Sequence, residues 1–290
     1  MNTIILAGGS GFLGRHLATA FRQKGFSVIT VSRSVQRGGD GSTITWDALP
    51  GVVDGATAVI NLAGSNIGGK RWSNAVRHEI LQSRLDATRK IVAAIHAAAK
   101  PPALINASAV GYYGNTYVPC NEAIPAGQTF AAQVVDKWEH EAQKAADVTR
   151  VAILRVGVVL DAKEGALPRL SLPMKLFIGG PLGSGRQWFP WVHRDDVVNA
   201  FVWAATTSDA SGPYNVVAPE DVTMRQFARE LGRVLHRPSW LRVPEFVLRL
   251  LLGRQADIVV HGQHVIPMRL GGTTFRFLYP TLNEALRRIG

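Results

Sequence analysis

Near its start the chain reads Gly8-Gly9-Ser10-Gly11-Phe12-Leu13-Gly14, which contains both a G-x-x-G-x-x-G and a G-x-G-x-x-G pattern. The apolar run Thr3–Ala7 precedes this turn and predicts a short buried strand. Apolar residues then recur at helical spacing from Phe12 to Phe21, and Gly25 ends that helix. A glycine-rich turn between a strand and a helix is typical of the phosphate-binding turn of a dinucleotide-binding fold.

The glycines of this turn each have a physical reason. Gly8 makes the tight turn after the strand, Gly11 lets the backbone approach a pyrophosphate, and Gly14 lets helix and strand pack closely. The helix N-terminus then offers free N–H groups and a positive dipole end to phosphate oxygens. We therefore predict that the whole turn contacts a cofactor, namely Gly8, Gly9, Ser10, Gly11, Phe12, Leu13 and Gly14.

The end of the second predicted strand, Ser27–Ser32, indicates which dinucleotide binds. An NAD site usually has Asp or Glu here to bind the ribose hydroxyls, whereas this chain has Arg33 between Ser32 and Ser34. A guanidinium pairs with a 2′-phosphate that a carboxylate would repel. We predict NADP(H) as the cofactor, with Ser32, Arg33 and Ser34 around the 2′-phosphate. The alternative is that Arg33 is an ordinary surface residue.

Strand and helix patterns alternate through the first half of the chain. Further strands are expected at residues 44–46, 58–62, 104–107 and 151–155, and helices within 72–100 and around 134–138. This alternation predicts an α/β, Rossmann-type, doubly wound parallel sheet. The pattern loosens after Leu160. We expect an NADP-binding domain at residues 1–160, to which 191–217 return, and a smaller, interleaved C-terminal substrate lobe at 161–190 and 218–290.

Composition restricts the function classes. Hydrophobic residues make up 47% and charged residues 18% of the 290, as in a globular protein. The formal net charge is +11, but there is no Lys/Arg block and no zinc-ligand spacing, so we expect no nucleic-acid partner and no metal. No apolar run reaches the roughly 20 residues of a membrane span. We expect no signal peptide at Met1, no internal disulfide with Cys120 as the single cysteine, and a cytoplasmic location.

Several longer motifs narrow the assignment. They are Asn61–Gly64, Gly68–Trp72, Ser108–Gly114, Gly179–Gly185, Pro190–Asp196 and Phe275–Leu282. With the glycine turn, they resemble the extended branch of the short-chain dehydrogenase/reductase superfamily and, within it, the atypical YfcH-like "epimerase family" with its C-terminal segment. The resemblance covers nearly the whole chain. It implies a Rossmann fold, a dinucleotide that also contacts Leu62, Ala63 and Gly64, and a possible homodimer.

The resemblance also implies a catalytic set that this chain lacks in part. Extended members use a serine after the fifth strand and a Tyr-x-x-x-Lys pair on the next helix, where the tyrosine exchanges a proton with the substrate oxygen. Ser108 matches the serine, but Ala131 and Val135 occupy the places of the tyrosine and lysine. Lys137 is two residues further on, about 200° around the helix, and points away from the expected site.

Tyr112 is the best replacement for the missing proton donor. It follows Ser108 by four residues, beyond the carboxyl end of a strand, where open α/β sheets bind ligands. We therefore predict Ser108 and Tyr112 as the catalytic residues. The alternatives are that Ser108 only hydrogen-bonds near the nicotinamide and that Tyr112 and Tyr113 only line the pocket or pack against the cofactor.

Other side chains are expected around the same cleft. Asn66, Lys70, Arg71 and Trp72 follow the fourth strand, and Arg186, Gln187 and Trp188 follow a glycine-rich loop suited to an anionic or sugar-bearing ligand. His193 lies between Trp191 and Asp195, which we expect to cap the next helix. A structural role for this histidine is favoured over proton transfer.

Two main functions remain. The first is an NADP(H)-binding oxidoreductase or epimerase that acts on a small polar, nucleotide-sugar-like substrate. The second is a non-catalytic NADP(H)-binding or sensing protein, which the missing Tyr-x-x-x-Lys pair favours. A third, a basic protein associated with nucleotides or RNA, rests on the net charge alone.

Overall fold

The computed structural model describes residues 2–34 and 42–289. Within them, a seven-stranded parallel sheet has the order β10-β7-β5-β4-β1-β2-β3. Its strands are β1 (Thr3–Ala7), β2 (Ser27–Ser32), β3 (Thr43–Thr45), β4 (Ala58–Asn61), β5 (Ala103–Ala109), β7 (Val151–Val156) and β10 (Gly212–Val216). The sheet confirms the predicted Rossmann-type architecture. Because β4 and β2 flank β1, the chain turns in opposite directions on either side of it, and ligands bind at such a switch point.

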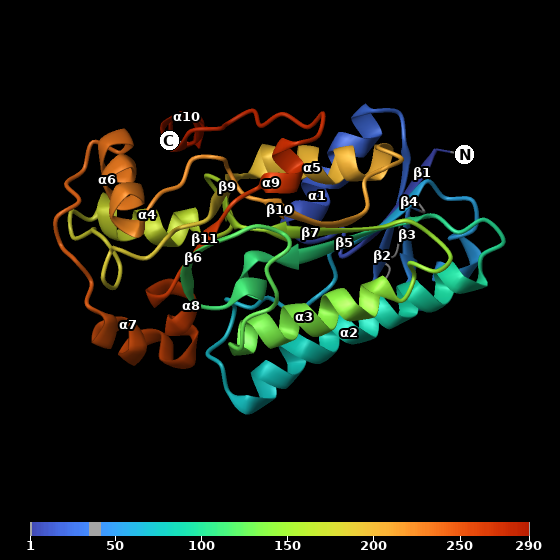
Figure 1. Cartoon of the computed structure of the whole chain (residues 1–290), viewed down its shortest axis with the longest axis horizontal. Helices are drawn as coiled ribbons and strands as arrows, with labels where there is room; N and C mark the ends of the chain where they lie inside the picture. The colour runs from blue at the N-terminus through green and yellow to red at the C-terminus, as the bar shows by residue number, and fades with distance from the viewer. Residues whose placement is uncertain (1, 35–41, 290) are drawn as a thin grey trace.

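Helices cover both faces of the sheet (Figure 1). One face carries α1 (Phe12–Gln23) and α5 (Arg194–Thr206), and the other carries α2 (Asn74–Ala97) and α3 (Phe130–Gln143). Along β1, Ile4 and Leu6 pack into the first layer, whereas Ile5 and Ala7 pack into the second. Burial on both faces explains why these strands read as continuous apolar runs and not as alternating ones.

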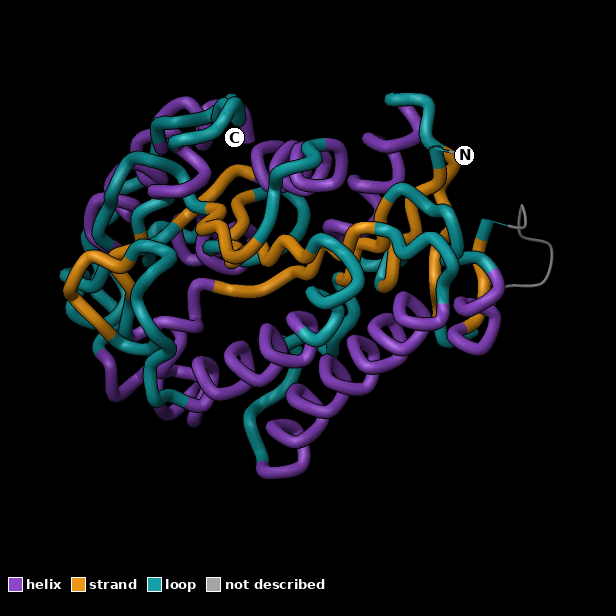
Figure 2. Tube along the Cα trace, turned by 45° about the vertical axis from the view of Figure 1, so that its right-hand side comes forward, coloured by secondary structure: helices purple, strands orange, loops and turns teal. Residues whose placement is uncertain are grey.

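A smaller lobe with its own core lies at the end of the molecule away from the N-terminus (Figures 1 and 2). It contains α4 (Leu167–Lys175), α6 (Met224–Val234), α7 (Glu245–Leu252), α8 (Asp257–Val260) and α10 (Leu282–Ile289). Thr223 and Gln226 form a capping box at the start of α6, as expected for a threonine before an apolar helix. α9 (Met268–Gly271) instead lies against β10 of the main sheet.

Two small parallel pairs join the lobe to the main sheet. β8 (Val158–Leu160) pairs with β9 (Trp191–His193), and β6 (Thr116–Cys120) pairs with β11 (Gln263–Val265). The 3₁₀ turns are η1 (Trp46–Gly51), η2 (Val110–Tyr113) and η3 (Gly253–Ala256). β8 and β9 lie outside the seven-stranded sheet, while α5 and β10 return to it. The domain limits at residue 160 and around 191–217 stay a prediction.

Candidate functional site

The glycine turn between β1 and α1 is shaped for close contact. Gly8 has a φ of +85°, which L side chains rarely adopt, and a Cβ on Gly14 would lie 2.5 Å from the carbonyl oxygen of Gly8. α1 begins after Gly11, and no side chain of the described residues caps it. The exposed N-terminal N–H groups therefore fit the pyrophosphate of a dinucleotide.

The end of β2 lies beside this turn. Ala7 pairs with Val31 in the parallel register, and the Gly8 N–H donates to the Val31 carbonyl at 3.5 Å. Arg33 and Ser34 follow on the exposed edge, and Arg33 forms no ion pair within the described part of the chain. An exposed guanidinium beside the phosphate turn fits a 2′-phosphate.

The loop after β4 closes the other side of the turn. A Cβ on Gly8 would lie 3.0 Å from the carbonyl carbon and oxygen of Leu62 and 3.1 Å from the Ala63 nitrogen. The Ala63 N–H donates to Asn61 Oδ1 at 3.1 Å, which fixes the loop on the buried Asn61 side chain. The structure thus brings Leu62, Ala63 and the turn together, as predicted for one cofactor site.

Ser108 lies within β5 and faces α3. It pairs in register with Arg155 of β7, so both side chains point to the same face of the sheet. The Ser108 hydroxyl donates to Glu139 Oε1. Arg155 holds that carboxylate with two hydrogen bonds, Nε to Oε1 at 2.9 Å and Nη2 to Oε2 at 2.8 Å. All three residues are buried, with 3 to 6% exposure.

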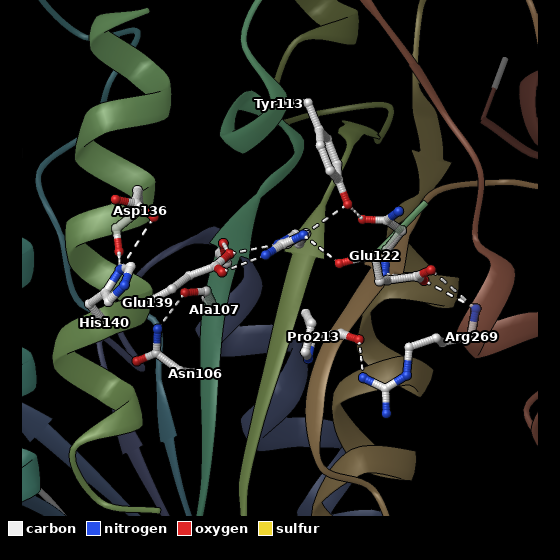
Figure 3. A network of polar contacts seen from close by, with 12 residues as sticks. Asn106, Ala107, Tyr113, Glu122, Asp136, Glu139, His140, Pro213 and Arg269 are labelled. Atoms are coloured by element: carbon white, nitrogen blue, oxygen red, sulfur yellow. Dashed lines mark hydrogen bonds and ion pairs between the residues drawn. The ribbon is translucent and has the colours of Figure 1, made fainter. Parts of the chain in front are cut away.

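Two tyrosines from η2 complete this cluster. The Tyr113 hydroxyl accepts from Arg155 Nη1 at 3.0 Å and donates to Asn215 Oδ1 at 2.7 Å. Figure 3 shows Glu139 and Tyr113 on opposite sides of the guanidinium that links them. Burial raises the pKa of Tyr113 to about 12, so the residue is a structural hydrogen-bonding group at neutral pH.

Tyr112 is placed differently. Its ring is half-buried and stacks on the Arg155 guanidinium, with the Cζ atom 3.5 Å from the ring centroid. Burial raises the pKa of Tyr112, and the charge of Arg155 opposes that rise. A side-chain hydrogen bond between Arg155 and Tyr112 also opposes the rise. Tyr112 is thus a half-buried neutral phenol whose proton is still available to a ligand, because Arg155 can only donate to its oxygen.

Ala131 and Val135 of α3 were predicted to occupy the places of the Tyr-x-x-x-Lys pair, and the structure shows what surrounds them. A Cβ on Gly111 would lie 3.6 Å from Ala131 Cβ, so Ala131 lies beside the η2 turn. Val135 is buried, whereas Lys137 is exposed on another side of α3. No cation or phenol on this face of α3 therefore replaces the tyrosine and lysine.

The loop after β4 is held by the smaller lobe. Arg71 donates from Nη2 to the Leu250 carbonyl at 3.2 Å, and Lys70 pairs with Glu79 at 3.8 Å on the surface. Trp72 is buried against Phe130, with ring centroids 5.0 Å apart. Asn66 Oδ1 accepts from the Gly68 N–H at 2.9 Å. Arg71 thus ties the loop to the smaller lobe, whereas Lys70 and Trp72 contact α2 and α3 of the main domain.

Arg186, Gln187 and Trp188 were also predicted to contact a ligand, but only one of them is exposed. Gln187 is buried and donates to the Leu182 and Val259 carbonyls at 2.9 and 3.1 Å. Trp188 stacks on His264 with centroids 4.1 Å apart. Arg186 alone is exposed and free to contact a ligand.

His193 is structural. It is 2% exposed, packs on Tyr279 with centroids 3.9 Å apart, and accepts the Asp195 N–H at Nδ1 over 3.1 Å. The N-cap of α5 is therefore His193 and not Asp195, which lies in the first turn. Expecting Asp195 as the cap was wrong because a neutral imidazole nitrogen can accept as a capping oxygen does. Burial lowers the pKa of His193 and keeps the ring neutral.

Glu139 and Arg155 were missed as site residues. Arg155 stands in the otherwise apolar run Val151–Val156, and a charge in a fully buried strand requires a partner. An arginine within this apolar strand predicts a buried acidic partner, but it does not indicate which Asp or Glu residue that partner is. Glu139 itself reads as one more polar position on an amphipathic helix.

No helix within residues 2–34 and 42–289 is long and apolar enough to cross a membrane. In the same residues, no three His, Cys, Asp or Glu side chains gather as a metal site. The cytoplasmic location and the homodimer stay predictions.

The fold and the glycine turn define a Rossmann-type dinucleotide-binding protein, and comparisons with known proteins narrow the class. The pattern of the NAD dependent epimerase/dehydratase family matches residues 4–217, and a domain of unknown function, DUF1731, matches residues 243–289. The chain belongs to the NAD dependent epimerase/dehydratase family, which confirms the resemblance seen in the sequence.

Relatives match over the whole chain. The chloroplastic SDR39U1 homologue of Arabidopsis thaliana is 39% identical over 302 residues, covering 99% of this chain and 86% of that protein. YfhF of Bacillus subtilis is 37% identical, covering 99% and 97%. The crystal structure of human SDR39U1 with NADPH superimposes with a TM-score of 0.93 at 35% identity, covering 99% of this chain and 98% of that one. The cofactor of that human structure agrees with the predicted NADP(H).

Proposed function

We propose that this chain binds NADP(H) and acts as an oxidoreductase or epimerase on a small polar, nucleotide-sugar-like substrate held at Ser108 and Tyr112. The observation that carries the proposal is the buried Ser108–Glu139–Arg155 cluster, on whose guanidinium the half-buried ring of Tyr112 stacks. When bound, the nicotinamide supplies or accepts a hydride. The protein's part is to orient the substrate and move a proton.

Support for the cofactor comes from the shape and charge of the turn. Gly8 and Gly14 leave no room for a Cβ, α1 offers uncapped N–H groups, and Arg33 is exposed beside them. The relative solved with NADPH shares this fold at a TM-score of 0.93. Arg33 would then bind the 2′-phosphate, and Leu62, Ala63 and Gly64 would line the dinucleotide.

Ser108 would act as a hydrogen-bond acceptor. Both carboxylate oxygens of Glu139 accept hydrogen bonds from Arg155, and Oε1 also accepts from the Ser108 hydroxyl. The Ser108 proton is therefore directed at Glu139, and the oxygen lone pairs remain for the ligand. Ser108 would hold a substrate hydroxyl or an amide N–H group and would not itself donate to a carbonyl.

Tyr112 would supply the proton. A phenol whose pKa is raised by burial keeps its proton at neutral pH and can donate it to a substrate oxygen on which negative charge develops. The guanidinium 3.5 Å from the ring centroid would stabilise the phenolate that remains. Tyr112 and Arg155 together would do the work that the absent tyrosine and lysine do in other family members.

The test is NADPH oxidation followed by absorbance with a panel of carbonyl and nucleotide-sugar substrates. Tyr112→Phe should lower the rate by roughly 10²–10⁴-fold, as expected for a general acid. Ser108→Ala should also slow turnover. Tyr117→Phe is the matched control, since Tyr117 is 66% exposed. Turnover that is unchanged in Tyr112→Phe would overturn the assignment of the proton donor.

Ala131 and Val135 favour a second function, a non-catalytic NADP(H)-binding or sensing protein. The same assay separates the two. Tight NADPH binding without oxidation across the panel, unaffected by either active-site variant, would support this alternative.

A further inference from the structure

The smaller lobe carries most of the large apolar side chains that the protein exposes. In the described part of the chain sixteen such side chains are exposed, and ten of them lie within residues 172–178 and 240–258. Among these, Trp240, Phe246 and Leu250 are 68, 72 and 74% exposed. Six of the eight residues of α7 are apolar, yet only Leu248 is buried. Such a concentration of exposed apolar side chains marks an interaction surface.

Two segments that are distant in the sequence build this surface, which we call the apolar end (residues 172–178 and 240–258). The indole N–H of Trp240 donates to the Phe177 carbonyl at 3.2 Å. The backbone N–H groups of Trp240 and Leu241 donate to the Gly179 carbonyl at 3.1 and 3.2 Å. α7 begins four residues after Leu241, and Figure 1 shows it at the same end of the molecule as α4. Both segments therefore belong to one end of the smaller lobe.

Phe177 keeps its ring on this surface in a strained conformation. Its φ of +63° is left-handed, which is rare for a bulky residue, whereas glycine would adopt it without strain. The side chain is 53% exposed, and the Arg237 guanidinium lies over its ring, with Cζ 4.6 Å from the centroid. Backbone strain at an exposed aromatic residue fits a contact site better than a role in folding.

The apolar end is also basic. Residues 167–179 and 236–258, which contain and flank it, hold six Lys and Arg residues but only two acids, a net charge of +4. Both acids, Glu245 and Asp257, pair with the same cation, Arg249. The other five cations have no acidic partner within these segments, and among them Lys175 and Arg242 are exposed.

Apolar side chains surrounded by unpaired cations match one kind of occupant. An anionic lipid bilayer offers phosphate groups to Lys and Arg and, directly beneath them, an apolar layer to Trp, Phe and Leu. A second copy of this chain would be a poor match, because two apolar ends face to face would set a net charge of +4 against another of +4.

We propose that the apolar end docks on the surface of an anionic lipid bilayer. Trp240, Phe246 and Leu250 enter the boundary between headgroups and acyl chains, and Lys175 and Arg242 contact the lipid phosphates. This inference goes beyond the proposed function and does not depend on it.

Sedimentation with lipid vesicles tests the proposal. Wild type should bind vesicles of mixed phosphatidylglycerol and phosphatidylcholine at least about tenfold more tightly than phosphatidylcholine alone, and roughly 0.5 M salt should remove the preference. Phe246→Gln/Leu250→Gln should bind the mixed vesicles roughly 10- to 100-fold more weakly. Leu278→Gln removes an exposed leucine outside the apolar end and should bind as wild type does.

Single charges separate docking by this surface from attraction by the whole basic protein. Lys175→Gln should weaken binding to the mixed vesicles roughly fivefold, because its ammonium group lies near the lipid phosphates. Lys24→Gln, at the end of α1, is the matched control and should leave binding unchanged. Equal losses in these two variants would mean that net charge alone attracts the protein, and the proposal would be overturned.

Two further results would overturn the proposal. One is that wild type does not bind the mixed vesicles. The other is a dimer in light scattering that Phe246→Gln/Leu250→Gln dissociates while vesicles bind neither form, which would assign the apolar end to a second copy. If thermal melting shows that the double variant does not fold, Lys175→Gln decides, because an exposed lysine can be replaced without a loss of packing.

Discussion

Replacing Glu139 with Gln removes one charge from the buried cluster and leaves Arg155 without its counter-ion. The two side chains are 8 and 4% exposed and are joined by hydrogen bonds of 2.8 and 2.9 Å. Breaking such a buried pair on one side costs about 3–5 kcal/mol, since the remaining charge stays desolvated. Because glutamine keeps the volume and one acceptor oxygen, we expect a loss near 3 kcal/mol, or a fall in Tm of roughly 6–12 °C.

A double-mutant cycle measured by urea and thermal unfolding tests this estimate. Adding Arg155→Met to Glu139→Gln removes the stranded charge, so the double variant should be more stable than the sum of the single effects predicts. The control Glu245→Gln breaks an exposed pair with Arg249 and should leave the unfolding free energy nearly unchanged. A loss below about 1 kcal/mol in Glu139→Gln, or strictly additive single effects, would refute the reasoning.

Three further outcomes follow from the same structure. Gly14→Ala should weaken NADPH binding at least about 100-fold, because its Cβ would lie 2.5 Å from the Gly8 carbonyl oxygen. In the control Gly51→Ala the added Cβ meets nothing within 4 Å, and equal NADPH affinities of the two variants would contradict the account. Because burial lowers the pKa of His193, the unfolded chain takes up a proton near pH 6.5 before the folded chain does. Stability should thus fall as the pH drops below about 6.5. Melting curves at pH 7.5 and 5.5 should show a smaller drop for His193→Asn, and an equal drop would count against the burial argument. Tyr113→Phe removes a buried hydroxyl bonded on both sides and should cost about 1–3 kcal/mol in urea unfolding, whereas a neutral effect would show that this hydroxyl is not needed.

The strands and the cofactor turn were predictable because their signals are local. Thr3–Ala7 and Ser27–Ser32 have the bounds expected from their apolar runs, and β5 extends its expected range of 104–107 to Ala103–Ala109. A strand, a glycine turn and an amphipathic helix follow one another within about twenty residues. No distant contact is needed to recognise them.

The charged cluster and the loop contacts were not predictable in this way. Ser108 meets Glu139 only because β5 and β7 pair in register and α3 packs across them. Arg71 and Gln187 read as ligand contacts from their loops, but they donate to backbone carbonyls of the smaller lobe. Such pairings depend on how distant segments dock, and the spacing along the chain does not contain that information.

Titration with NADPH and with NADH, followed by nicotinamide fluorescence, tests the central claim most directly. Wild type should bind NADPH at least about tenfold more tightly than NADH, because the Arg33 guanidinium pairs with the 2′-phosphate. Arg33→Ala should lose that preference, whereas Arg22→Ala on the far end of α1 should keep it. Equal affinity for the two nucleotides in wild type, or no binding of either, would contradict the account.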